Sequence, residues 1–286
     1  MLPNELTLGA VDLSVRDLDR SVAFYERSLG LRLHRREDPV AAMGAGAGDL
    51  VVLHELPGAR DPGRTAGLYH FALLYPDREE LALALRRIGA TRTPITGASD
   101  HGVSEAIYLS DPDGNGIELY RDRPREQWPP PSGPDEKIGM FTAPLDLEDL
   151  LTAAPGEELP PHPGAGLVMG HVHLHVGDLA TGNAFYLDVI GFDAMASYAG
   201  VAEFVSAGGY HHHLGYNVWR GRGIPAAPPD VVGLRHWTVL LPSRADVDAV
   251  RERTEAAGIA SEERDGGIVV RDPWEIPMLL RPRAAA

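Results

Sequence analysis

Two histidines and one carboxylate of this sequence, His70, Glu118 and His171, could together bind a metal ion. Such a facial triad is typical of non-haem Fe(II) enzymes, because it leaves coordination positions open for a chelating substrate and for dioxygen. The sequence has no cysteine, which excludes disulfides, thiolate zinc sites, iron–sulfur clusters and a cysteine nucleophile. Any metal ion must therefore be held by histidine and carboxylate side chains.

An internal repeat makes these three residues stand out. Residues 11–31 (VDLSVRDLDRSVAFYERSLGL) align without a gap with residues 172–192 (VHLHVGDLATGNAFYLDVIGF). Residues 67–79 (GLYHFALLYPDRE) align in the same way with residues 233–245 (GLRHWTVLLPSRA). The chain therefore consists of four related units in the order A-B-A-B.

Equivalent positions of the four units differ in their capacity to bind a metal. The first-strand position holds, in unit order, Ala10, His70, His171 and His236. The last-strand position of the B units holds Glu118 in unit two and Leu279 in unit four. Units one and four together lack a suitable ligand set. The sequence therefore predicts one metal site, formed where units two and three pair across the two halves of the chain.

Each unit is predicted to contain one strand, one helix and three further strands. Alternating apolar residues at 8–15 and 168–176 indicate half-buried strands, and Asp17 and Asp178 stand where helices should begin. In unit two, a strand (LYHFALLYP) precedes a helix (DREELALALRRIGA) that we expect to end at Gly89. A hairpin (SEAIYLSDPDGNGIELYRD) follows, with Asp-Pro-Asp-Gly-Asn-Gly as its turn.

Length and composition divide the 286 residues into two halves, 1–121 and 167–286. A proline-rich linker, 122–166, with one short helix (LDLEDLL), joins them. The net charge of -15 argues against nucleic acid or an anionic membrane as a partner. No apolar run reaches the roughly 18 residues of a membrane span, and no signal peptide is visible, so we expect a cytoplasmic protein.

Further histidines lie in the two units that supply the proposed ligands. The segment GGYHHHLGYNVW (208–219), predicted as the last strand of unit three, contains His211, His212 and His213. Residues 99–120 of unit two contain His101 and Tyr108. Imidazole titrates near neutral pH and is therefore suited to proton transfer.

These motifs resemble the vicinal-oxygen-chelate superfamily, and within it the extradiol catechol dioxygenases and bacterial catechol-2,3-dioxygenase-like proteins. The resemblance covers nearly the whole chain and rests on the four units and on the segments LYHFALLYPDREEL, DHGVSEAIYLSDPDGNGIELYRDRP, GHVHLHVGDL and GGYHHHLGYNVW. It implies an α+β fold, in which four βαβββ modules form two cupped mixed β-sheets with the helices outside.

The resemblance also implies residue roles. The metal ligands of the family match His70, Glu118 and His171. The acid–base histidine of the family lies in a His-His-x-Leu stretch, which nominates His212, whereas His101 matches a second active-site histidine. Tyr108 is a weaker candidate for the substrate-binding tyrosine. The sequence departs from the family in one respect: extradiol enzymes usually take all three ligands from the C-terminal half, which here lacks the glutamate.

The expected activity is therefore an extradiol-type, ring-cleaving dioxygenase of aromatic catabolism that uses Fe(II), with a small aromatic diol and O2 as substrates. Mn, Zn or Ni are alternative metals, since His and Glu ligands tolerate several. The sequence leaves the oligomeric state open, a homo-oligomer included. One alternative is a glyoxalase- or epimerase-like lyase or isomerase, although such enzymes usually keep a second carboxylate ligand. Another is a non-catalytic small-molecule-binding protein of the bleomycin-resistance type, which leaves the histidine-rich segment unexplained.

Several conspicuous side chains have simpler explanations. His173 and His175 alternate with His171 on one strand, and a structural or ligand-orienting role fits them better than metal binding. His236 is interpreted as a remnant of the duplication, and His54 as a residue at the rim of unit one. The aromatic pairs at 24–25 and 185–186 are expected in the cores of helices.

Overall fold

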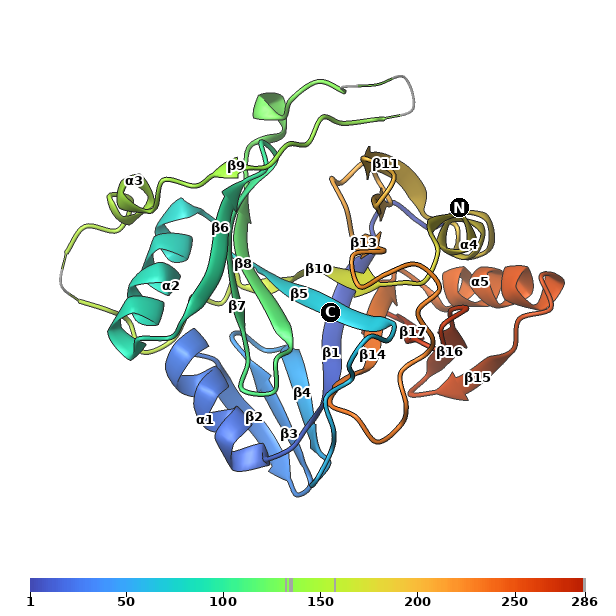
Figure 1. Ribbon diagram of the computed structural model, residues 1–286, viewed down its shortest axis with the longest axis horizontal. Helices are drawn as coiled ribbons and strands as arrows, with labels where there is room; N and C mark the ends of the chain where they lie inside the picture. Colours follow the sequence, from blue (N-terminus) through green and yellow to red (C-terminus); the bar gives the residue numbers. More distant parts are fainter. Residues whose placement is uncertain (132, 134–135, 157, 285–286) are drawn as a thin grey trace.

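The computed structural model describes residues 1–131, 133, 136–156 and 158–284, and it contains the four modules that the repeat predicts (Figure 1). Module one consists of β1 (Thr7–Val15), α1 (Leu18–Leu29), β2 (Arg32–Glu37), β3 (Val40–Gly44) and β4 (Asp49–Glu55). Module two consists of β5 (Gly67–Leu74), α2 (Arg78–Thr91), β6 (Ile95–Asp100), β7 (Ser104–Ser110) and β8 (Gly116–Asp122).

The second half of the chain repeats this order. Module three consists of β10 (Val168–His175), α4 (Leu179–Asn183), the π-helical η2 (Ala184–Ile190), β11 (Asp193–Tyr198), β12 (Ala202–Ser206) and β13 (Leu214–Asn217). Module four consists of β14 (Gly233–Leu241), α5 (Arg244–Ala256), β15 (Ser261–Arg264), β16 (Gly267–Arg271) and β17 (Pro277–Pro282). The segment between the halves contains η1 (Arg125–Gln127), β9 (Ala143–Pro144) and α3 (Leu147–Leu151). The α+β fold of four βαβββ modules is thereby confirmed.

Each of the two mixed sheets combines one module from each half of the chain. The eight-stranded sheet has the order β15-β16-β17-β14-β1-β4-β3-β2 and joins modules one and four. The nine-stranded sheet has the order β11-β12-β13-β10-β5-β8-β7-β6-β9 and joins modules two and three. Antiparallel pairing of β5 with β10 makes the junction in the second sheet. The expected pairing of modules two and three is therefore confirmed.

The helices cover the outer faces of the sheets, as Figure 1 shows for α1 and α2 on one side and for α4 and α5 on the other. Alternation along β5 sends Phe71 and Leu73 toward the helices, where they join the main apolar core. Ala72 lies on the opposite, cupped face, in a small cluster with Ala106 and Tyr120. One face of this sheet therefore stabilises the fold, while the other is left for polar side chains.

The expected helix starts and one expected stop are present. Asp17 accepts a hydrogen bond from the Arg20 backbone N–H, and Asp178 accepts one from Thr181 N–H, so both aspartates are N-caps. Gly30 ends α1 in a left-handed conformation, with φ 73°. Helix α2 does not end at Gly89 as predicted; it continues to Thr91, because Arg92 takes the left-handed position with φ 54°.

The strand predicted over 208–219 is wrong in its first half. Gly208 and Gly209 both have left-handed φ values, 62° and 70°, which turn the chain and delay β13 until Leu214. His211, His212 and His213 therefore lie in a buried turn before β13 rather than alternating along a strand.

A tyrosine on the first helix of each half is hydrogen-bonded to the hairpin turn of the following module. Tyr25 Oη donates to Asp111 Oδ2 over 3.1 Å, and Tyr186 Oη donates to Asp272 Oδ2 over 2.9 Å. Both tyrosines are fully buried, which agrees with their expected place in the helix core. Because the paired modules belong to different sheets, these two hydrogen bonds connect the sheets within each half.

The described residues contain no helix that is both long and apolar enough to span a membrane.

A glycine of β10 is required by close packing beneath the candidate site. A Cβ atom added at Gly170 would overlap the hydroxyl of Tyr120, whose ring lies 4.8 Å from that of His171. We expect Gly170→Ala to lower the free energy of unfolding by about 1–3 kcal/mol, because overpacking forces neighbours to shift. Gly89→Ala, at an exposed helical position with open space around it, should instead raise stability slightly. Urea unfolding of both variants tests this, and equal effects would contradict it.

Candidate metal centre

Three neighbouring strands place His70, Glu118 and His171 around one point. His70 lies on β5, Glu118 on β8 and His171 on β10, and the register pairs Ala72 of β5 with both Glu118 and His171. His70 is two residues from Ala72 and therefore lies on the same face. One ligand atom of each residue lies within 4.8 Å of the others, and all three residues are buried.

The distances within this group fit a metal ion. His70 Nε2 lies 3.0 Å from Glu118 Oε2, and His171 Nε2 lies 3.1 Å from the same oxygen. Two ligands bound about 2.1 Å from one ion at a right angle would lie about 3 Å apart. His70 Nε2 makes no well-directed hydrogen bond despite being buried. A buried nitrogen without a well-directed hydrogen bond is costly, and a metal ion would satisfy its lone pair.

The charge state of the group suits metal binding at neutral pH. Burial lowers the pKa of His171 to about 4, although the adjacent Glu118 partly opposes this. Burial would raise the pKa of Glu118, but His171 and His70 hold it well below its usual range. A neutral imidazole and an ionised carboxylate are the forms that bind metals.

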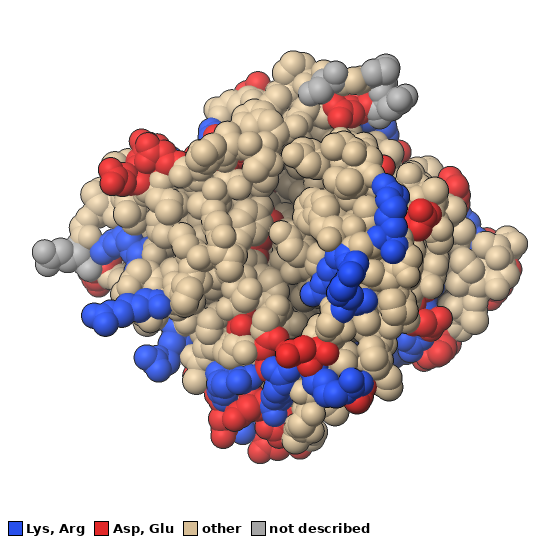
Figure 2. Space-filling model, in the orientation of Figure 1, with Lys and Arg blue, Asp and Glu red and all other residues tan. Residues whose placement is uncertain are grey.

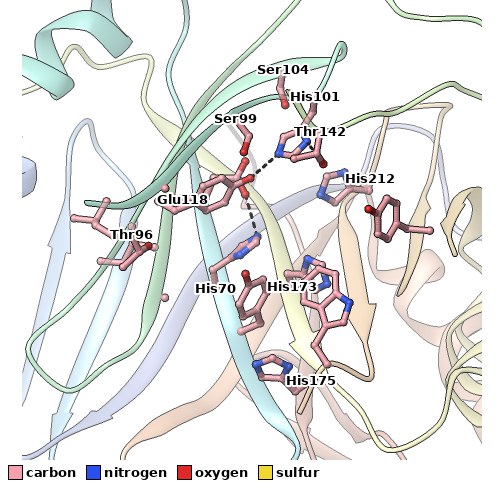
Figure 3. A pocket seen from close by; sticks show the side chains of 18 of the residues that line it. His70, Thr96, Ser99, His101, Ser104, Glu118, Thr142, His173, His175 and His212 are labelled. Carbon is pink, nitrogen blue, oxygen red and sulfur yellow. Dashed lines mark hydrogen bonds and ion pairs between the residues drawn. The ribbon is translucent and has the colours of Figure 1, made fainter. Parts of the chain in front are cut away.

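His101 and Tyr108 form a hydrogen-bonded pair on one side of the cavity, beside Glu118 (Figure 3). His101 Nε2 lies 2.7 Å from Tyr108 Oη, and His101 Nδ1 lies 2.9 Å from the carbonyl oxygen of Phe141. Since a carbonyl only accepts, Nδ1 carries the proton and Nε2 accepts from the tyrosine hydroxyl. Burial and the nearby Glu118 raise the pKa of Tyr108 well above its ordinary value, so that this hydroxyl stays protonated.

His212 faces the metal centre from the side of module three. Its ring centroid lies 4.1 Å from that of His171, and its Nδ1 lies 2.8 Å from His211 Nδ1. His211 Nε2 in turn lies 2.8 Å from Asp122 Oδ1. If His211 donates to that carboxylate, its Nδ1 accepts from His212, and the Nε2 of His212 retains a free lone pair. Burial, together with the charges of His171 and His211, lowers the pKa of His212 well below its ordinary value.

His173 and His175 are linked by an asparagine of β13. Asn217 Nδ2 lies 2.9 Å from His173 Nε2, while Asn217 Oδ1 lies 2.8 Å from His175 Nδ1. Both histidines line the cavity, with the ring centroid of His173 5.1 Å from that of His70. They belong to the cavity wall beside His70, and neither is part of the three-residue group.

A cavity of about 690 Å³ opens over these residues. Figure 2 shows the hollow in the face of the molecule, and Figure 3 shows His70, His101 and His212 around Glu118 within it. Met140, Phe141 and Thr142, from the segment between the halves, also line it. That segment pairs with the sheet edge through β9 and β6, so it is more than a connection between the halves.

Sequence reasoning assigned no role to several residues in the cavity wall and behind it. Phe141 fixes His101, Asp122 and His211 hold His212, and Trp219 closes one wall. These residues lie in turns, in the segment between the halves or at a strand end, where no repeat or periodicity indicates them. The run of three histidines was the one available signal, and it did not identify Asp122 as their partner.

The equivalent face of the other sheet holds a different group. Asp12 lies 2.6 Å from His54 Nε2 and 3.3 Å from His236 Nε2. Within the part of the chain that the structure describes, the His70, Glu118 and His171 group is the one with metal-binding spacing.

The geometry corresponds to a known family. The sequence model of the Glyoxalase/Bleomycin resistance protein/Dioxygenase superfamily matches residues 7–119 and 168–276, and the chain belongs to this superfamily. Catechol-2,3-dioxygenase of Bacillus subtilis (strain 168) is 45% identical over 270 residues, which cover 93% of each chain.

Solved structures share the fold at low sequence identity. A crystal structure of a dioxygenase candidate from Bacillus subtilis has a TM-score of 0.67 at 15% identity and covers 100% of this chain and 87% of that one. Glyoxalase I from Zea mays has a TM-score of 0.58 at 18% identity and covers 96% and 92% of the two chains.

A buried histidine beside the site makes folding depend on pH. Burial and the charges of His211 and His171 lower the pKa of His213 to about 3, against about 6.5 in an unfolded chain. Between these values the unfolded state binds more protons, so the stabilisation is complete above about pH 6.5 and declines as the pH falls. Between pH 6.5 and pH 5, the free energy of unfolding of wild type should fall by about 2 kcal/mol more than that of His213→Asn. Parallel pH profiles of unfolding free energy for the two proteins would contradict this.

Proposed function

We propose that the protein is an extradiol-type dioxygenase that uses Fe(II) and O2 to cleave the ring of a catechol-like vicinal diol. The observation that carries the proposal is the His70, Glu118 and His171 group, whose ligand atoms converge at the floor of an open cavity. Identity of 45% to a catechol-2,3-dioxygenase over 93% of both chains supports the same reaction class. Mn, Zn and Ni are the alternative metals for this ligand set.

His70, Glu118 and His171 would hold the metal, which would supply Lewis acidity that lowers the pKa of a chelated phenolic hydroxyl. The three protein ligands come from one wall of the cavity, so the opposite side is left for the diol and for dioxygen. Aromatic side chains surround this space, with Phe204 5.0 Å from His212 between ring centroids. Where a bound diol covers these rings it would displace water, which would strengthen its electrostatic contacts.

His212 is the proposed acid–base residue. Its lowered pKa keeps the imidazole neutral at pH 7, and its hydrogen bond to His211 leaves Nε2 free to take a proton from the diol. The proton taken up is stabilised through His211 by Asp122. The same imidazole can return the proton to the opened product.

Tyr108 and His101 are the proposed substrate-binding pair. Because the tyrosine hydroxyl donates to His101, its oxygen lone pairs are available to a substrate hydroxyl or a proton donor in the cavity. Phe141 holds His101 in this orientation from outside the sheet. We therefore assign the pair a role in orienting the diol rather than in metal binding.

Enzymes of the lyase or isomerase alternative usually keep a second carboxylate ligand. The metal-type group of the described residues contains Glu118 as its one carboxylate. The dioxygenase assignment needs no further ligand. The binding-protein alternative predicts a dispensable metal, and it leaves the contacts among His212, His211 and Asp122 unexplained.

Metal retention tests the assignment of the three ligands. Glu118→Gln should lower Fe(II) affinity by more than the roughly 10–100-fold typical for loss of a residue that only supports a ligand. His70→Ala should do the same, whereas His236→Ala, its repeat equivalent in the other sheet, should retain metal. Metal content after anaerobic loading and desalting measures this. Full metal retention in Glu118→Gln would refute the assignment of the site.

Turnover tests the proposed acid–base role of His212. His212→Ala should keep bound metal and lose about 10²–10⁴-fold in kcat, the usual contribution of a general acid–base residue. Asp122→Asn should lower kcat by a smaller factor, because Asp122 acts through His211. Oxygen uptake and the absorbance of the ring-cleavage product from catechol give both rates. Normal turnover in His212→Ala would remove this residue from the mechanism.

A further inference from the structure

One arginine of the cavity wall has no acidic partner. Arg220 follows β13 and lines the cavity, half-buried, and its Nη1 donates over 3.3 Å to the backbone oxygen of Thr65. No aspartate or glutamate among the described residues forms an ion pair with it, and burial alone lowers its pKa.

A half-buried guanidinium without a counter-ion favours the binding of an anion. Removing a cation from water without a counter-ion costs free energy, and the chain has acidic groups in excess, with a net charge of -15. Arg220 nevertheless faces the cavity and bonds there to a single backbone carbonyl. A fixed positive charge in an otherwise acidic protein marks the place where an anion would bind.

The position of Arg220 is remote from the metal centre. Asn217 Oδ1 lies 2.8 Å from His175 Nδ1 and also accepts a hydrogen bond from the backbone N–H of Trp219, the residue before Arg220. Arg220 therefore follows directly from the end of the cavity where His175 lies. His175 and the ligand His171 are four residues apart on β10, a separation of about 13 Å along a strand. Figure 3 shows His175 at the end of the histidine row that is farthest from Glu118.

Aromatic rings line the path between the two ends. The ring of Tyr69 lies 4.8 Å from that of His70, 4.9 Å from that of His175 and 5.2 Å from that of Trp219. The cavity of about 690 Å³ is within the range that holds drug-sized ligands, so a single catechol ring leaves much of it empty. Basic side chains lie beside the hollow at the surface (Figure 2).

We propose that the substrate is a catechol whose ring bears a side arm that ends in a carboxylate, with the diol at the metal centre and the carboxylate on Arg220. This inference rests on the proposed dioxygenase function and specifies its substrate class. The planar guanidinium matches a carboxylate with two parallel hydrogen bonds, and one arginine alone balances one such charge. Tyr69 and Trp219 pack against the arm.

The test compares 3-(3,4-dihydroxyphenyl)propionate with its uncharged amide, and with catechol itself. Wild type should favour the acid over the amide in kcat/KM by about tenfold or more, chiefly through KM. Arg220→Gln should abolish that ratio, and Arg220→Lys should restore part of it. Arg222→Gln is the matched control, since Arg222 is exposed in the same loop and bonds to Gly200. The ratio cancels any general loss of metal or folded protein.

Anaerobic calorimetry of the acid and the amide with the same proteins separates this inference from the proposed function. Suppose that wild type cleaves catechol but shows equal kcat/KM and equal affinity for the acid and the amide. That result would overturn the carboxylate subsite and leave the dioxygenase proposal intact. A preference for the acid that survives Arg220→Gln would overturn it as well. Absence of cleavage of any diol would refute the dioxygenase, while tighter binding of the acid that is lost in Arg220→Gln would still support the subsite.

Discussion

The antiparallel pairing of β5 with β10 is the constraint on which the candidate site depends. This register places His171 and Glu118 on either side of Ala72, with His70 two residues away on the same face. A slip of one residue would move His171 to the helix-covered face, because side chains alternate along a strand. Ala72 is small enough to leave room above it for three converging ligands. Gly170, next to His171, leaves room for Tyr120 below.

Burial is the second physical condition of the site, and its effects are costly for folding but useful for chemistry. The histidines around the cavity are withdrawn from water, so His171, His173, His175 and His212 have lowered pKa values. Neutral imidazoles cost stability in acid, since the unfolded chain can protonate them. At neutral pH the same burial provides lone pairs for a metal ion and for proton transfer. The hydrogen bonds to Asn217, His211 and Asp122 hold these rings in fixed orientations.

The sequence was sufficient for the features that repeat. The four modules, the N-caps Asp17 and Asp178, and the group of His70, Glu118 and His171 all follow from comparing the chain with itself. Features without a repeat counterpart were not predictable. The left-handed glycines before β13, the π-helical segment after α4, and the contact of Phe141 with His101 depend on tertiary packing. A pattern identifies which strand a residue occupies, but not which loop will approach it.

The exchange of modules between the sheets has a consequence for biosynthesis. Ribosomes release the N-terminal half first, when β1 and β5 each have one neighbour and one open edge. Those edges are closed by β14 and β10, which are synthesised later. Until then the nascent half presents two unpaired strand edges, the kind of surface that pairs wrongly with other chains. The hydrogen bond from Tyr25 to Asp111 joins residues that both lie within this half, so it can hold modules one and two together during the delay.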